Sequence, residues 1–205
     1  MPNGNAPSRR TGGRVRSQDA HDAILAAALE LVEELGYRAV TIERIATRAD
    51  VAKSTIYRWW KSKPALVMDA YRTAVEQRMP QPDTGSLASD LTVFVTALYE
   101  VGAHPVRIRT LRGLMAEAQL DPAFATQFQE WVESRRARVA AILLRGRERG
   151  ELASGIDLDA ATDHVFGLFW YRLLVGHRPL DPADAPGQLA QLLDGLRPRP
   201  SGDGH

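Results

Sequence analysis

Residues 51–66, VAKSTIYRWWKSKPAL, combine positive charge with large aromatic side chains. The segment holds four basic residues and no acidic one, and three aromatic residues fall within positions 57–60. Lysine and arginine neutralise phosphates, and the polar end of a tyrosine or tryptophan can reach a phosphate oxygen while its ring packs. This chemistry is non-covalent and fits a helix that lies against a polyanion. The alternative is a small helical core with a solvated basic face.

The rest of the sequence offers no pattern for catalysis or metal binding. The five histidines lack metal-ligand spacing, and we find no nucleophile motif, phosphate-cradling glycine loop or close carboxylate pair. We therefore expect neither an enzyme nor a cofactor nor a metal. A helical-bundle enzyme would need convergent polar residues that are not visible here.

Composition describes an ordinary globular protein of 205 residues, 44% apolar and 25% charged. No apolar run is long enough to cross a membrane, the N-terminus has no apolar signal core, and cysteine is absent. These features predict a cytoplasmic protein without a membrane partner.

Charge is unevenly distributed along the chain. Residues 1–62 carry ten basic and seven acidic residues, whereas residues 63–205 carry 16 and 18. The first 16 residues hold four arginines and no acid, and we expect them to be a disordered basic arm. The arm either follows a DNA minor groove or is an inert solvated tail. A second disordered tail is expected over 198–205.

Apolar periodicity predicts an all-α protein of about nine helices. Thr41, Ser62 and Asp121 are expected caps, whereas Pro186 leaves the start of the last helix uncertain. The expected helices span approximately 18–35, 42–49, 53–60, 63–79, 86–102, 105–119, 122–149, 157–176 and 182–196.

The second and third of these helices, joined by ADVA, have the outline of a helix-turn-helix. Ile56 and Trp60 are four residues apart and should face the core. Tyr57 lies at the edge of that face, where its hydroxyl can reach a phosphate. Lys61 and Lys63 stand at the start of the next helix, whose N-terminus also attracts phosphate.

The segment TIERIATRADVAKSTIYRWWKSKPALV resembles the DNA-binding domain of the tetracycline-repressor (TetR) family. The upstream ILAAALELVEELGY resembles the family's first helix, so the similarity covers about residues 20–70. It implies a three-helix DNA-binding domain, here 17–62, followed by a larger helical domain for ligand binding and dimerisation, here 63–197. It also implies a homodimer formed through the two C-terminal helices, a palindromic double-stranded DNA operator and a small-molecule effector.

Two positions depart from the family pattern. Asp50 stands where the family usually has glycine before the turn valine, and aspartate tolerates a left-handed backbone better than most residues. Ala52 stands where the family usually has a capping serine, a loss of about 1 kcal/mol. The resemblance assigns Thr41, Tyr57 and Lys63 to phosphates and Lys53, Ser54 and Thr55 to base edges. The remaining DNA-binding candidates are Arg44, Arg58, Trp59 and Lys61. Of these, Trp59 either reaches a phosphate through its indole N–H or only packs against its neighbours.

The expected helix over 157–176 lacks a polar face. From Val165 to Val175 only Arg172 is charged, so nearly all sides need cover. A dimer interface, with Gly167 permitting close approach, supplies that cover. The alternative is a central core helix of one subunit.

Apolar and aromatic side chains of the second domain are candidates for an effector pocket or for plain core. Gln119 and His104 are possible polar anchors. Together these expectations favour a ligand-responsive regulator, most simply a repressor released by a mainly apolar effector. The competing hypothesis is a helical scaffold that never meets DNA. The candidate effector-binding residues are Phe94, Leu98, Met115, Phe128, Trp131 and Trp170.

Overall fold

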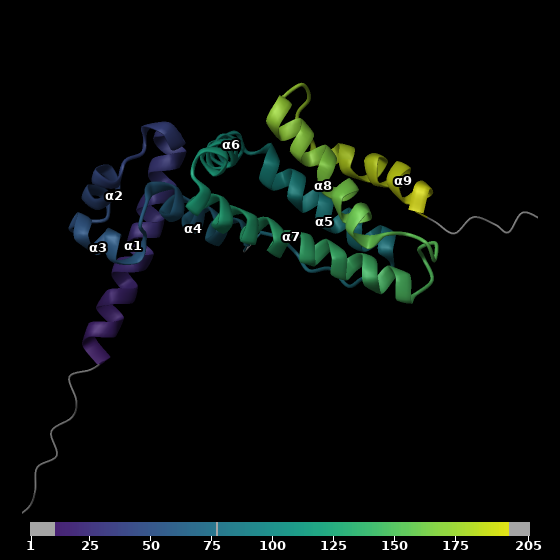
Figure 1. Cartoon of the computed structure of the whole chain (residues 1–205), viewed down its shortest axis with the longest axis horizontal. Helices are drawn as coiled ribbons and strands as arrows, with labels where there is room; N and C mark the ends of the chain where they lie inside the picture. The colour runs from purple at the N-terminus through teal and green to yellow at the C-terminus, as the bar shows by residue number, and fades with distance from the viewer. Residues whose placement is uncertain (1–10, 77, 197–205) are drawn as a thin grey trace, which may run out of the picture. The chain divides into compact units, whose positions relative to one another are not determined.

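The structure, a computed structural model, describes residues 11–76 and 78–196, with residues 11–16 described by their backbone alone. Within these residues all regular structure is helical, which confirms the predicted all-α class (Figure 1). The chain forms two compact units that divide after Tyr71. The helices are α1 (Thr11–Leu35), η1 (Tyr37–Ala39), α2 (Ile42–Arg48), α3 (Lys53–Trp59), α4 (Lys63–Glu76), α5 (Leu87–Ala103), α6 (Pro105–Leu120), α7 (Pro122–Glu148), α8 (Leu158–Val175), η2 (Pro182–Asp184) and α9 (Ala185–Leu196).

Helix α1 begins at Thr11, seven residues earlier than the periodicity predicts. Residues 11–16, expected in the basic arm, are therefore helical. Only the two arginines of residues 11–16 are good helix formers, and two of the six residues are glycines, so helix propensity does not account for this extension. Residues 1–10 of the arm and the expected tail over 198–205 lie outside the described residues.

The first unit packs α1, α2 and α3 around a small apolar core. Ile24 of α1, Ile45 of α2 and Ile56 of α3 are fully buried there. Gly36 ends α1 with a φ of 77°, a conformation that glycine adopts without strain. The Thr41 hydroxyl caps α2 by accepting a hydrogen bond from the Arg44 amide at 3.3 Å. Local sequence signals therefore determine where these helices begin and end.

The division between the two compact units falls after Tyr71, within α4. The Trp60 Nε1 donates a hydrogen bond to Asp69 Oδ2 at 3.2 Å, which ties the first half of α4 to the residues before it. Lys63 Nζ also donates to the Tyr37 carbonyl at 3.3 Å. These contacts explain why the early part of α4 belongs to the first unit.

The second unit contains α5 to α9. Helix α5 lies between α7 and α9 and contacts both, while α6 packs on α7 and α5 (Figure 1). One face of α7 is buried from Phe124 to Ile142, at the three- to four-residue spacing of a helix. Pro186 falls in the first turn of α9, where a proline is tolerated, because η2 precedes that helix.

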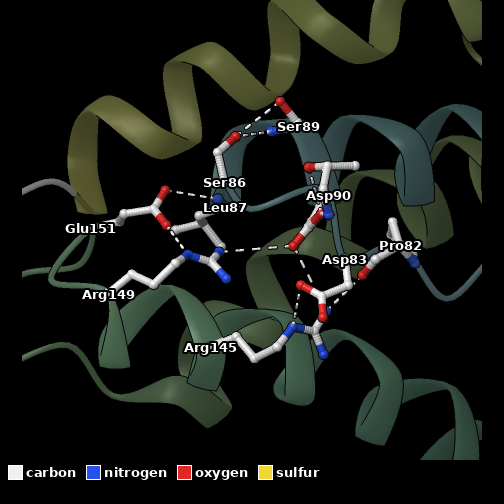
Figure 2. A network of polar contacts seen from close by, with 10 residues as sticks. Pro82, Asp83, Ser86, Leu87, Ser89, Asp90, Arg145, Arg149 and Glu151 are labelled. Atoms are coloured by element: carbon white, nitrogen blue, oxygen red, sulfur yellow. Dashed lines mark hydrogen bonds and ion pairs between the residues drawn. The ribbon is translucent and has the colours of Figure 1, made fainter.

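A polar network centred on Asp90 joins the start of α5 to the end of α7 (Figure 2). Asp90 is completely buried, and its Oδ1 accepts hydrogen bonds from the Thr84 amide at 2.7 Å and the Thr84 hydroxyl at 2.8 Å. Its Oδ2 lies 3.7 Å from an Arg145 guanidinium nitrogen and 3.8 Å from one of Arg149. Burial by itself raises the pKa of Asp90, but the Thr84 hydrogen bonds and both arginines outweigh it and lower that pKa.

Glu151 completes this network from the segment after α7. Its Oε2 accepts a hydrogen bond from the Leu87 amide at 2.7 Å, which satisfies a free N–H in the first turn of α5. Its Oε1 pairs with Arg149, and Arg145 donates to the Pro82 carbonyl at 2.7 Å. The network therefore fixes the segment between α4 and α5 onto the end of α7.

None of the described helices is both long enough and apolar enough to cross a bilayer. Over the same part of the chain, His, Asp and Glu side chains form no group of three able to hold a metal ion.

Candidate nucleic-acid interface

The turn between α2 and α3 forms without its usual glycine. Asp50 has a φ of 52°, the left-handed conformation expected for this position. The Val51 amide donates to the Ala46 carbonyl at 3.0 Å, which closes the end of α2. Ala52 makes no side-chain cap to α3, in agreement with the sequence. The helix-turn-helix geometry therefore accommodates both departures from the family pattern.

Helix α3 separates an apolar face from a polar one. Ile56 is fully buried and Trp60, which follows the helix, is only 6% exposed, so both predicted core positions are confirmed. The opposite side carries the candidates for DNA contact. Lys53, Ser54, Tyr57, Arg58 and Trp59 are exposed, and Thr55 is half-buried.

Three candidate DNA-binding residues are already oriented by neighbouring groups. Thr41 caps α2 and remains exposed. Lys63 is half-buried, with its Nζ 4.3 Å above the Tyr37 ring and hydrogen-bonded to the Tyr37 carbonyl. Arg44 donates to the Ala39 carbonyl at 3.0 Å, whereas Lys61 is exposed at the start of α4. Side chains held in this way lose less conformational freedom when they bind.

Lys53, a candidate for reading base edges, pairs with Glu43 of α2 at 3.2 Å. Hydrogen bonding to its own backbone and then to Lys53 lowers the pKa of Glu43. Both side chains are exposed, so this pair is weak in water. Lys53 can therefore exchange Glu43 for a base acceptor at little energetic expense.

His21 of α1 is a neighbour of Trp59 that sequence reasoning missed. Its ring centroid lies 4.9 Å from that of Trp59 and 4.8 Å from that of Trp60. Arg58 covers Trp59 from another direction at 5.7 Å, yet 43% of Trp59 remains exposed. No local signal connects position 21 to position 59, because the contact depends on how α1 packs against α3. The structure thus gives Trp59 both a packing surface and an accessible edge.

The six effector candidates fall into separate groups. Phe128 lies 5.7 Å from Trp131 and 6.3 Å from Trp170 between ring centroids, and we call these three residues the aromatic cluster. Phe94 instead packs edge-on against Phe166 at 6.0 Å. Leu98 and Met115 are half-buried, whereas the possible anchors His104 and Gln119 are exposed.

Helix α8 shows features of both interpretations of its apolar sequence, a dimer interface and a core helix of one subunit. Phe169 and Leu173 are buried against the rest of the unit, as a core helix requires. Tyr171, Leu174 and Val175 remain 56%, 48% and 58% exposed at its C-terminal end. Arg172 points inward and pairs with Asp184 at 2.8 Å, so the charged residue of this stretch adds no charge to the exposed face. The chain alone leaves an apolar surface on α8.

A helix-turn-helix with an exposed basic second helix, followed by a larger helical unit, is typical of helix-turn-helix transcriptional regulators. The sequence model described as "Bacterial regulatory proteins, tetR family" matches residues 24–70. The model of the "Tetracyclin repressor-like, C-terminal domain" matches residues 81–192. The chain therefore belongs to the TetR family of transcriptional regulators, as the sequence resemblance predicted.

Individual relatives agree with this family. The chain is 36% identical over 167 residues to the regulator YdeS of Bacillus subtilis, covering 80% of this chain and 82% of that protein. It is 29% identical over 181 residues to AqdR of Rhodococcus erythropolis, covering 88% and 86%. The crystal structure of the TetR-family regulator SCO0332 superposes with a TM-score of 0.75 at 34% identity, covering 88% of this chain and all of the other.

Proposed function

We propose that this regulator is a cytoplasmic repressor that binds a palindromic operator as a homodimer and is released by a small, mainly apolar effector. The observation that carries the proposal is the exposed polar face of α3, flanked by Thr41 and Lys63. In helix-turn-helix proteins the second helix enters the major groove and its neighbours contact the backbone. Thr41, Tyr57 and Lys63 are assigned to phosphates, and Lys53, Ser54 and Thr55 to bases. Arg44, Arg58, Trp59 and Lys61 complete the set of proposed DNA-binding residues.

The first prediction separates backbone contacts from base contacts. Lys63→Ala and Tyr57→Phe should weaken binding to all duplexes by similar factors, because phosphate contacts carry no sequence information. Changes at Lys53 or Thr55 should alter which duplex is preferred, by about 1–3 kcal/mol per lost base contact. The measurement is selection from a random duplex library, followed by affinities at several salt concentrations.

Arg109→Ala is the control for the loss of one positive charge, because it removes an exposed arginine of α6. It should leave both affinity and sequence preference close to those of the wild type. A Lys63→Ala protein that selects a different sequence would reverse the assigned roles.

The second prediction concerns the dimer. The exposed residues Tyr171, Leu174 and Val175 support an interface through α8 and α9, and Gly167 leaves open space for a close neighbour. Light scattering at micromolar concentration should give twice the 22.6 kDa chain mass. Leu174→Glu should shift this mass to the monomer, whereas Leu120→Glu, at an exposed leucine of α6, should not. A wild-type monomer would contradict the proposed dimer.

The third prediction concerns the effector. The aromatic cluster supports a site for an apolar or aromatic molecule, with Phe94, Leu98 and Met115 as further candidates. An effector that lowers operator affinity must bind more weakly to operator-bound protein by the same factor, typically about 5- to 150-fold. Compounds should be titrated into a protein with Trp59→Phe and Trp60→Phe, following Trp131 and Trp170 fluorescence. An operator-releasing compound that leaves this fluorescence unchanged would place the site elsewhere.

A further inference from the structure

Glu43 is an acidic residue within a surface whose proposed DNA contacts are basic or polar. It belongs to the first turn of α2, between Thr41 and Arg44 in the sequence. Its carboxylate lies 3.2 Å from Nζ of Lys53, the first residue of α3. All of these residues belong to the first compact unit. A carboxylate repels DNA phosphates, so Glu43 affects the binding of every duplex that this surface meets.

Lys53 stands where a positive charge is unfavourable. It begins α3, whose first turn holds no acidic residue and whose cap position, Ala52, forms no side-chain hydrogen bond. The N-terminus of a helix carries a positive partial charge, which repels the Lys53 ammonium. The Glu43 carboxylate supplies the opposite charge from a neighbouring helix. The ion pair therefore favours a position of the Lys53 side chain close to α2 in the free protein.

The pair is suited to exchange with a base but not with a phosphate. The Lys53 and Glu43 side chains are 55% and 63% exposed, so neither is trapped. The N-terminal residues of a recognition helix face base edges, whereas phosphates lie on either side of the groove. An ammonium has three N–H donors, so Lys53 can donate to a base and remain near Glu43. Reaching a phosphate instead separates the pair.

Glu43 is charged at neutral pH. Hydrogen bonding to its own amide, then to Lys53 and to the Thr41 hydroxyl, lowers the pKa of its carboxyl. The carboxylate is therefore available both to hold Lys53 and to repel phosphates.

We propose that Glu43 is a specificity-determining residue, which weakens binding to non-operator DNA by keeping Lys53 away from phosphates. The inference rests on the proposed function, in which Lys53 reads a base. On the operator, Lys53 donates to a base acceptor beside Glu43. On other duplexes it stays with Glu43, and the carboxylate repels the backbone. Glu43 thereby widens the difference in affinity between the operator and other DNA, because its unfavourable contacts act mainly against the wrong sequences.

The test compares Glu43→Gln, Lys53→Gln and the double variant in the full-length protein. The probes are the duplex that wild-type protein selects from a random library and a scrambled duplex of the same length and composition. Glu43→Gln should bind the scrambled duplex about fivefold more tightly at low salt, the scale of one close charge–charge interaction in water. Affinity for the selected duplex should rise much less, so the ratio of the two affinities falls.

The salt dependence shows whether the freed lysine is responsible. A lysine that gains a phosphate contact steepens the slope of log K against log salt by about 0.9. Glu43→Gln should show this change on the scrambled duplex, and the double variant should not, because it lacks the Lys53 ammonium. Glu43→Asp, which keeps the charge on a shorter side chain, should give a smaller change of the same sign. It serves if circular dichroism shows that Glu43→Gln fails to fold.

Glu34→Gln is the matched control. Glu34 of α1 pairs with Arg48 of α2 at 2.8 Å, so this variant removes the same charge from another pair between two helices of the first unit. Arg48 is not a proposed DNA contact, and it keeps its pair with Glu30 at 3.3 Å. Both affinities should stay within about twofold of wild type, with an unchanged salt slope. An effect equal to that of Glu43→Gln would trace the change to net charge and overturn the inference.

The remaining outcomes separate this inference from the proposed function. Wild-type protein that binds all duplexes equally would overturn both. Wild-type protein that selects a duplex, together with a folded Glu43→Gln variant of unchanged affinity for scrambled DNA, would overturn only the role of Glu43. A loss of affinity for the selected duplex alone would also overturn it, because Glu43 would then itself accept a hydrogen bond from a base, as carboxylates do from cytosine N4. A steeper slope that persists in the double variant would show that Lys53 is not the freed cation.

Discussion

Replacing Trp60 with alanine is expected to destabilise the first unit by about 4 kcal/mol, a typical loss for a large buried aromatic residue. Trp60 is almost completely buried, its ring packs on His21, and its Nε1 bonds to Asp69. The substitution leaves a cavity and removes the Nε1–H donor that bonds to Asp69. Because α3 has no side-chain cap at Ala52, packing is its main support, and DNA binding should be lost with it.

The neighbouring Trp59→Ala variant is the control, because the two tryptophans are adjacent in sequence and differ in burial. Trp59 is 43% exposed, so this change should have a much smaller effect on the free energy of unfolding while still weakening DNA binding. Chemical denaturation followed by circular dichroism, together with duplex binding at low salt, distinguishes the two. Equal losses of stability would show that Trp60 is not the anchor of the core.

Asp90→Asn is expected to destabilise the second unit by about 2 kcal/mol at neutral pH, the size of a lost charge-assisted hydrogen-bonding group. The asparagine oxygen can still accept from Thr84, but the negative charge that faces Arg145 and Arg149 is removed. The segment before α5 should loosen, because the network that fixes it to the end of α7 then carries unbalanced positive charge.

This effect should depend on pH in a defined direction. The pKa of Asp90 is lower in the folded protein than its ordinary value of 3.8, so the folded state favours the ionised carboxyl. The stabilisation is present above the unfolded pKa and disappears as pH falls through the folded one. The free energies of unfolding of wild type and Asp90→Asn should therefore differ most near pH 7 and converge in acid. The pKa of Glu151 is also lowered in the folded protein, so the stabilisation that Glu151 contributes is likewise lost as the pH falls.

Urea denaturation at several pH values between 7 and 3 measures this difference. Asp159→Asn, at an exposed position of α8, is the control and should stay within about 0.5 kcal/mol of wild type throughout. If the difference in free energy of unfolding between wild type and Asp90→Asn does not narrow in acid, Asp90 stabilises the protein through its packing and not through its charge.

Local features of the sequence determined most of the fold. Thr41 and Asp121 cap helices as expected, because a capping side chain needs only the amides two or three residues ahead. Asp50 adopts the left-handed turn, and the spacing of Ile56 and Trp60 places both in the core. The resemblance over residues 20–70 also indicated the family, since it rests on residue types at fixed offsets within one short segment.

Tertiary packing alone decided which distant side chains meet. Phe94 and Phe128 both lie on apolar stripes, yet only Phe128 joins Trp131 and Trp170. His21 reaches Trp59, Glu76 reaches Arg135, and Asp90 reaches Arg149 across long stretches of sequence. An apolar period defines the buried face of a helix but not the helix that covers it. That choice depends on how whole helices pack together, and the candidate effector site depends on it too.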